Sequence, residues 1–179
     1  IKIFRNEYPK RFLHQLVSGQ LDMDRLDYLS RDSFFSGVSE GIIGSSRIIK
    51  MLNLHEGQLV VEAKGIYSIE KFLVARRLMY WQVYLHKTSV AAEKMLVNIL
   101  KRAKLLASGG VDLFGSPSLR YFLYNNADKM EFMQKGPALN HFVMLDDADF
   151  ISAIKVWTGC DDLVLRELCT AFINRRLFK

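Results

Sequence analysis

Residues 21–36 read LDMDRLDYLSRDSFFS, and this acidic stretch decides the fold that the sequence predicts. On an α-helix, Asp24, Tyr28 and Asp32 share one stripe, because they follow an i, i+4 and i+8 spacing. Two carboxylates and a phenol do not suit a packed core, since a buried carboxylate is costly unless it is paired, hydrogen-bonded or bound to a metal. The stripe is therefore either solvated or part of a site.

Two interpretations of this helix compete. In the structural one, Asp22 caps the helix, and Asp24 and Asp27 stabilise the positive end of the helix dipole. Asp27 would also form an i, i+4 ion pair with Arg31. This interpretation leaves Asp32, far from the helix start, without a role. In the functional one, the stripe binds a ligand, and residue chemistry alone leaves both interpretations open.

A second stripe lies in residues 76–87, where Arg76, Tyr80 and Tyr84 again follow an i, i+4, i+8 spacing and His86 and Lys87 end the predicted helix. Aromatic stripes at helical spacing usually belong to a core, so this pattern alone favours a structural role. In that role the arginine covers apolar surface, and the last two residues interact with the helix C-terminus. Beside an acidic helix, the same set could line a cleft.

The chain as a whole is predicted to be mainly α-helical with a small β-hairpin at the Glu56–Gly57 turn. Residues near Gly136 and Pro137 suggest a looser stretch. We expect two parts, residues 1–108 and 109–179, with residues 108–116 as a hinge. The predicted helices cover residues 9–18, 22–36, 45–52, 68–87, 88–106, 118–124, 148–156 and 163–177.

Composition is typical of a folded protein. The chain has 179 residues, of which 50% are hydrophobic, and a net charge of +6 that suits an anionic partner such as a nucleotide. Nucleic acid is also compatible with this charge, but no nucleic-acid motif favours it. Cys160 and Cys169 show neither zinc-ligand spacing nor a disulfide framework, so we expect buried thiols and a cytoplasmic protein. No apolar run approaches the roughly 20 residues that span a bilayer.

Several polar residues are predicted to be structural. Three histidines, His14, His55 and His141, have no assigned chemistry. The acidic residues 146–149 are typical of a capped helix start, because they lack the spacing and the glycine of a calcium loop. The basic residues 101, 102 and 104 are predicted to form a solvated helix face.

Three segments resemble one family. The string QLDMDRLDYLSRDSFFSGV, residues 20–38, resembles the segment that carries the last metal-binding aspartate of HD-domain phosphohydrolases, in the deoxynucleoside triphosphate triphosphohydrolase branch. Residues 75–87, ARRLMYWQVYLHK, resemble the helix of that branch that contacts phosphate and base. Residues 167–179 resemble its closing helix, with an Arg-x-Leu-Phe-Lys end.

The sequence departs from the family in one respect, because it contains no His-Asp dipeptide. The resemblance therefore implies the C-terminal portion of a longer enzyme, without catalytic residues of its own and inactive in isolation. The alternative is a non-catalytic nucleotide-binding or oligomerisation module.

The resemblance also implies roles for the first stripe. Asp24 would be a ligand of a divalent metal, which could be Mg, Mn, Fe, Ni or Zn. Arg25 stands where the family has a phosphate-binding lysine, and the guanidinium changes the geometry of that contact. Tyr28 and Asp32 would contact the sugar, with the carboxylate accepting from a 3′-hydroxyl.

The second stripe would complete the substrate site. Arg76 corresponds to a phosphate contact and Tyr84 to a residue that packs against the base, with Tyr80, His86 and Lys87 beside them. The expected reaction is hydrolysis of a nucleotide, with a metal-activated water attacking phosphorus. Relatives form oligomers, so a homo-oligomer is expected.

Overall fold

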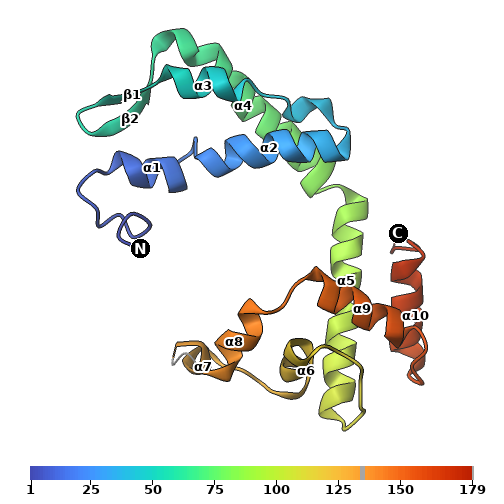
Figure 1. Cartoon of the computed structure of the whole chain (residues 1–179). Coiled ribbons are helices and arrows are strands. Elements are labelled where there is room, and N and C mark those ends of the chain that lie inside the picture. Colours follow the sequence, from blue (N-terminus) through green and yellow to red (C-terminus); the bar gives the residue numbers. More distant parts are fainter. Residues whose placement is uncertain (134–135, 179) are drawn as a thin grey trace. The chain divides into compact units, whose positions relative to one another are not determined.

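The computed structural model describes residues 1–133 and 136–178 and divides into two compact units, Ile1–His86 and Lys87–Lys179 (Figure 1). The predicted fold class, mainly α with one small β-hairpin, is confirmed. Among the described residues, no helix combines the length and the apolar character needed to cross a membrane.

The first unit builds on α2 and α4, which lie against each other (Figure 1). Its core joins Leu26 and Leu29 of α2 to Phe72 and Met79 of α4. The elements of this unit are α1 (Phe12–Ser18), α2 (Met23–Ser36), the 3-10 turn η1 (Ser39–Gly41), α3 (Ser45–Met51), β1 (Leu52–His55), β2 (Gln58–Val61), the 3-10 turn η2 (Ala63–Gly65), α4 (Ile66–Met79) and the π-helical turn η3 (Tyr80–Tyr84).

Local signals explain the bounds of α2. Asp22 is the N-cap, and its carboxylate accepts a 2.8 Å hydrogen bond from the backbone N–H of Arg25. Gly37 ends the helix in the left-handed conformation, with a φ of 72°. The predicted cap, the predicted end and the Asp27–Arg31 ion pair are all confirmed.

The predicted hairpin is confirmed, with Leu52 opposite Val61 and His55 opposite Gln58 in an antiparallel register. Glu56 and Gly57 form the turn with φ values of 49° and 75°. Two successive left-handed residues are the requirement of a type I′ hairpin turn, which explains the tight connection.

Three helix predictions need correction. The first helix begins at Phe12 and not at Pro9. The helix predicted over residues 68–87 begins earlier, at Ile66, and changes at Tyr80 into a π-helical turn, where the Leu85 N–H donates to the Tyr80 carbonyl over 2.7 Å. The final helix stops at Ile173, where the chain turns away from helical geometry.

The second unit is organised around α5 (Lys87–Ser108), which buries Met95, Ile99 and Ala103 against Trp157 and Leu165. The sequence places α5 in the N-terminal part of the chain, whereas in the structure it packs with the residues that follow it. The other helices are α6 (Pro117–Tyr124), α7 (Lys129–Met133), α8 (Pro137–Val143), α9 (Asp147–Trp157) and α10 (Leu163–Ile173).

The looser stretch predicted near Gly136 and Pro137 falls in part on residues 134–135, which lie outside the described residues, and α8 begins directly after it at Pro137. Pro137 takes the first turn of α8, where its missing N–H costs nothing. Phe132 of α7 and Phe142 of α8 pack edge to face with ring centroids 5.8 Å apart. These short helices depend on such tertiary packing, which sequence periodicity does not show.

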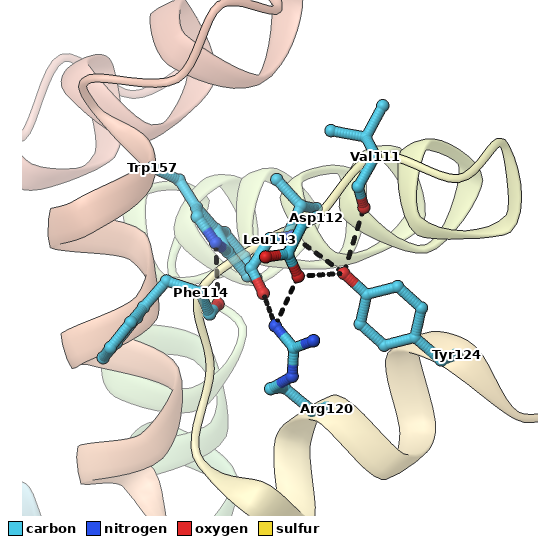
Figure 2. Close-up of polar contacts among 7 residues, drawn as sticks. All are labelled: Val111, Asp112, Leu113, Phe114, Arg120, Tyr124 and Trp157. Atoms are coloured by element: carbon cyan, nitrogen blue, oxygen red, sulfur yellow. Dashed lines mark hydrogen bonds and ion pairs between the residues drawn. The ribbon is translucent and has the colours of Figure 1, made fainter.

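The predicted hinge at residues 108–116 is a hydrogen-bonded loop. Figure 2 shows three side chains from α6 and α9 that hold its backbone. The bonds are Leu113 N–H to the Tyr124 hydroxyl (2.7 Å), that hydroxyl to Val111 O (3.0 Å), Arg120 to Leu113 O (2.6 Å) and Trp157 Nε1 to Phe114 O (2.9 Å). Arg120 also pairs with Asp112 at 2.8 Å.

The predicted solvated face on α5 is wrong for two of its three residues. Arg102 donates to the carboxylate of Asp162 at the start of α10, with Nε 3.0 Å from Oδ1. Lys104 donates from Nζ to the carbonyls of Phe122 and Asn125, both at 2.7 Å, and so satisfies the C-terminus of α6. Both cations therefore join α5 to a neighbouring helix.

The other residues assigned structural roles have contacts that fit them. His14 bonds through Nδ1 to the carbonyl of Ile3 at 2.9 Å, and His141 stacks on Tyr121 with ring centroids 4.4 Å apart. Asp146 and Asp149 form a capping box at the start of α9. Cys160 and Cys169 are free thiols, and the second is buried. Lys179, the last residue of the predicted closing motif, lies outside the described residues.

Candidate functional site

The aspartate stripe of α2 lies at the edge of the core, against which Tyr28 packs. Leu26, Leu29 and Ser33 are the buried residues of this helix, whereas Asp24 is exposed and Tyr28 is half-buried. The predicted stripe is therefore part of the surface of the first unit, and η3 covers its end at Asp32.

The centre of the candidate site is a hydrogen bond between the two predicted stripes. The Tyr84 hydroxyl donates to Oδ2 of Asp32 over 2.7 Å. The Tyr84 ring contacts Tyr28 edge to face at 6.1 Å and Tyr80 edge to face at 5.2 Å. With the cation–π contact between Arg76 and Tyr80, the structure brings together five of the nine predicted site residues through direct contacts.

Burial raises the pKa of two phenols of this cluster, Tyr84 and Tyr28. Loss of solvent raises the pKa of Tyr84, and the hydrogen bond to the Asp32 carboxylate raises it further. Burial, followed by the neighbouring Tyr80, also raises the pKa of Tyr28, while the positive charges of Arg25 and Arg76 lower it in part. Neutral phenols can donate hydrogen bonds without adding negative charge beside a phosphate.

The two arginines of the site are held differently. Arg25 donates from Nη1 to the Asp22 carboxylate at 2.7 Å and to the carbonyl of Gly19, so its guanidinium is bound at the N-cap of α2. The guanidinium carbon of Arg76 lies 5.9 Å from the centroid of the Tyr80 ring, a cation–π contact that leaves its N–H groups free to bind an anion. Among the described residues, Arg76 is thus the predicted phosphate contact whose guanidinium has no hydrogen bond to another residue.

His86 closes the first unit and Lys87 opens the second, and both side chains are exposed. Their predicted substrate contacts remain predictions.

Asp24 differs from the other carboxylates at this helix. Asp22 is bound to Arg25, Asp27 to Arg31, and Asp32 to Tyr84. Within residues 1–133 and 136–178, Asp24 is the carboxylate of α2 for which no hydrogen bond or ion pair is found. An exposed carboxylate of this kind fits one position in the oxygen-rich coordination of a divalent ion.

Asp24 alone does not make a complete metal site. The described part of the chain contains no group of three or more His, Cys, Asp or Glu side chains arranged to hold a metal. Asp24 therefore fits as a single ligand, and the remaining ligands would have to come from outside the described residues.

Sequence analysis did not single out Gln82 and Glu40, although they support the site. Gln82 of η3 donates from Nε2 to Glu40 of η1 over 3.0 Å, and this hydrogen bond is the main reason that the pKa of Glu40 is lowered. The contact ties the π-helical turn to the segment after α2. The two residues are 42 positions apart, and no local pattern links them.

The chain is similar to several known proteins. Residues 43–113 match the model of the HD associated region. The chain is 33% identical over 178 residues to the uncharacterized protein YwfO of Bacillus subtilis. This alignment covers 99% of this chain and 39% of that protein. It is also 27% identical over 97 residues to a Dictyostelium discoideum homolog of the deoxynucleoside triphosphate triphosphohydrolase SAMHD1, covering 52% of this chain and 19% of that protein.

A solved structure extends the comparison. The crystal structure of a phosphohydrolase from Bacteroides thetaiotaomicron superimposes with a TM-score of 0.97 and 63% sequence identity, over 99% of this chain and 44% of that chain. The chain thus spans about two fifths of the length of the Bacillus and Bacteroides proteins. Together, the similarities support a protein related to the HD-domain phosphohydrolases.

Proposed function

We propose that this chain is part of a metal-dependent phosphohydrolase that acts on nucleotides, with deoxynucleoside triphosphates as the first candidate substrates. One observation carries the proposal: the Tyr84–Asp32 hydrogen bond joins the two predicted stripes into one cluster, on the same helix as the unpartnered Asp24. The names of the Bacteroides and Dictyostelium proteins support the reaction class.

Each residue of the cluster has a role in this proposal. Arg76 binds phosphate oxygens, because a guanidinium forms strong charge-assisted hydrogen bonds with them. The Asp32 carboxylate, oriented by Tyr84, accepts from a sugar hydroxyl through its second oxygen. The Tyr28 ring occupies the position of a ribose 2′-hydroxyl, which would favour deoxyribose. The Tyr84 ring packs against the base.

The metal would be held in part by Asp24. When bound, a divalent ion polarises a phosphoryl oxygen and lowers the pKa of a coordinated water, which supplies a nucleophile at neutral pH. Arg25 reaches a phosphate in this proposal only by leaving Asp22, so its contribution to binding is smaller than that of Arg76.

The test is hydrolysis of deoxynucleoside and ribonucleoside triphosphates by the full-length protein, in the presence of each candidate metal. We expect hydrolysis of a deoxynucleotide, and we expect Asp32→Asn to lower kcat/KM by about 10- to 100-fold, the effect of losing a hydrogen bond to a charged group. Asp27→Asn is the matched control, because Asp27 lies on the same helix and, within the described part of the chain, pairs only with Arg31.

Two other outcomes are informative. Nucleotide binding without hydrolysis in any metal would favour the non-catalytic nucleotide-binding module instead. Absence of both binding and hydrolysis would contradict both proposals.

A further inference from the structure

A cleft of about 530 Å³ lies within the second unit, and apolar side chains form most of its surface. Helices α5, α6, α8 and α9 and the short helix α7 all contribute to its walls. Pockets for small ligands have volumes of about 300–1,000 Å³ and are mostly apolar, with a few polar groups that fix the ligand. The size and composition of this cleft are therefore those of a small-molecule site.

Three phenylalanine rings from three helices form one wall of the cleft. The rings of Phe122 (α6) and Phe132 (α7) are nearly parallel, with an interplanar angle of 8° and centroids 6.3 Å apart. The Phe142 ring (α8) is perpendicular to both, at 6.5 Å and 5.8 Å. These contacts hold the rings in place, yet Phe142 is still 59% exposed. The wall is thus a preformed apolar surface that is open to a ligand.

The lining of the cleft changes from apolar to polar along α6. Leu119 lies in the first turn of this helix, and Asn125 and Asn126 follow its last turn. At a rise of 1.5 Å per residue, Leu119 and Asn125 are about 9 Å apart along the helix axis. At the polar end, Lys104 of α5 donates from Nζ to the carbonyls of Phe122 and Asn125, both at 2.7 Å. The cleft therefore suits an amphipathic ligand.

Lys104 carries a charge that its surroundings do not neutralise. Its side chain is half-buried, and burial lowers the pKa of the ammonium. Within the described residues, Lys104 forms no ion pair, and the carbonyls that it contacts are neutral groups. A cation withdrawn from water is costly unless it is paired, and an ammonium can donate a third hydrogen bond. An anion in the cleft would supply both the charge and the acceptor.

The same observations select the class of anion. Among the described residues that line the cleft, Lys104 is the one charged side chain. A phosphate group is normally bound by several cations or by an arginine fork, whereas a carboxylate carries a single negative charge. An aromatic wall by itself would also suit a quaternary ammonium ion, but the charge of Lys104 repels a cation. The charges therefore favour a carboxylate with an apolar body.

We propose that this cleft binds an alkyl carboxylate, with the carboxylate on Lys104 and the alkyl chain along Phe122 and Leu119 of α6. The residues that line it all belong to the second unit, whereas the Tyr84–Asp32 cluster belongs to the first. The inference goes beyond the proposed function and requires neither metal nor nucleotide.

The experiment is isothermal titration calorimetry of the full-length protein with octanoate, and with 1-octanol as the uncharged ligand of the same chain length. We expect octanoate to saturate a single site per chain with a dissociation constant below about 1 mM. The alcohol cannot form an ion pair with Lys104, so it should bind at least about tenfold more weakly.

Substitution of Lys104 tests the charge. Lys104→Gln keeps a donor for the carbonyls at the end of α6 but removes the charge. We expect it to weaken octanoate binding at least about tenfold and to change 1-octanol binding by less than about threefold. Lys101→Gln is the matched control, because Lys101 is exposed and lies one turn earlier on α5. It should leave both affinities unchanged.

A second variant tests the cleft and leaves Lys104 in place. Ala127 lies in the segment between α6 and α7 and lines the cleft. Ala127→Phe should fill part of the space, so both octanoate and 1-octanol should bind at least about tenfold more weakly. An unchanged circular dichroism spectrum for each variant shows that these losses do not come from misfolding.

Three results would overturn the proposal. The first is a wild-type protein without saturable octanoate binding, as expected if another part of its own chain covers the cleft. The second is 1-octanol binding as tight as octanoate binding, which would show that the site does not recognise a carboxylate. The third is octanoate binding that is insensitive to both Lys104→Gln and Ala127→Phe, which would place the ligand elsewhere.

Discussion

The hydroxyl of Tyr84 donates to Asp32 across two helical segments, and this bond fixes the orientation of a carboxylate that would otherwise rotate freely. Burial and the bond itself raise the pKa of Tyr84, so the phenol stays a donor at neutral pH. Because the folded-state pKa is above the unfolded value, the stabilisation is fully present below about pH 10 and is lost as the pH rises further. The Tyr84 hydroxyl can therefore donate to Asp32 throughout the physiological pH range.

Removing that hydroxyl tests its contribution. Tyr84→Phe keeps the ring contacts with Tyr28 and Tyr80 but removes the donor to Asp32. We expect the free energy of unfolding at pH 7 to fall by about 1 kcal/mol, as measured by urea unfolding. Tyr67→Phe is the control, because Tyr67 is 79% exposed. Equal effects of the two substitutions would show that the Tyr84 hydroxyl contributes nothing specific.

At the residue scale, the sequence was sufficient where the chemistry is local. The Asp22 cap and the Asp27–Arg31 pair involve residues within one turn of each other, and both were predicted. The Tyr84–Asp32 bond joins residues 52 positions apart. The family resemblance placed both residues in one candidate site. Sequence spacing alone could not show that Tyr84 donates to Asp32.

The 3-10 turn η1 packs closely against α2 and α4 at Gly41. An added Cβ at Gly41 would lie 2.7 Å from the Ser33 Cβ, 2.8 Å from the Leu29 carbonyl oxygen and 2.9 Å from the Met79 sulfur. The carbonyl belongs to helix backbone and cannot move aside easily. Gly41 therefore allows η1 to fit between α2 and α4.

Gly41→Ala should destabilise the first unit by about 1–3 kcal/mol, the usual cost of overpacking. Gly44→Ala is a close control, since the nearest atom to its added Cβ is 3.8 Å away and its φ of −79° suits any residue. Urea unfolding midpoints of the two variants provide the comparison. Similar midpoints would contradict the packing described here.

Helices α5 and α10 are joined by the Arg102–Asp162 ion pair. The pair, together with the Leu165 N–H, lowers the pKa of Asp162 to about 2 from an ordinary value of 3.8. A lowered folded-state pKa means that the stabilisation is present above about pH 4 and is lost as the pH falls towards 2.

Asp162→Asn tests this linkage, because asparagine also caps helices but carries no charge. The wild type should lose urea resistance between pH 4 and pH 2 more steeply than the variant, as followed by Trp157 fluorescence. Asp161→Asn, which changes the exposed neighbouring residue, should keep the wild-type pH dependence. Parallel pH profiles for Asp162→Asn and the wild type would count against the ion pair.

Element prediction failed where tertiary contacts override local pattern. The apolar periodicity of residues 68–87 indicated one α-helix, but the hydrogen bond from the Leu85 N–H to the Tyr80 carbonyl makes the last turn π-helical. Helices α7 and α8 are short and depend on contacts such as Phe132 with Phe142. By contrast, the hairpin was predictable, since its Glu56–Gly57 turn is a strong local signal.

At the scale of the whole molecule, the two units have separate cores. The cluster around Phe72 contains residues of the first unit alone, and the cluster around Trp157 contains residues of the second alone. The chain also has one tryptophan in each unit, Trp81 and Trp157, so each unit has its own fluorescent probe.

Because the two cores are separate, a core substitution in one unit should change the unfolding free energy of that unit and not of the other. In a Trp157→Phe background, Trp81 reports on the first unit, and Ile48→Val should lower its unfolding free energy by about 1 kcal/mol. In a Trp81→Phe background, Trp157 should show no change for the same substitution, whereas Ile154→Val should shift it. If both probes respond equally to Ile48→Val, the two units unfold as one cooperative structure.

We propose that α2 presents Asp24 to a divalent metal in a nucleotide phosphohydrolase. The most direct test measures the metal content and the deoxynucleotide hydrolysis of the full-length protein for wild type, Asp24→Ala and Asp27→Ala. The account predicts that Asp24→Ala loses bound metal and lowers kcat by about 100-fold or more, while Asp27→Ala retains both. Unchanged metal content and activity in Asp24→Ala would contradict it.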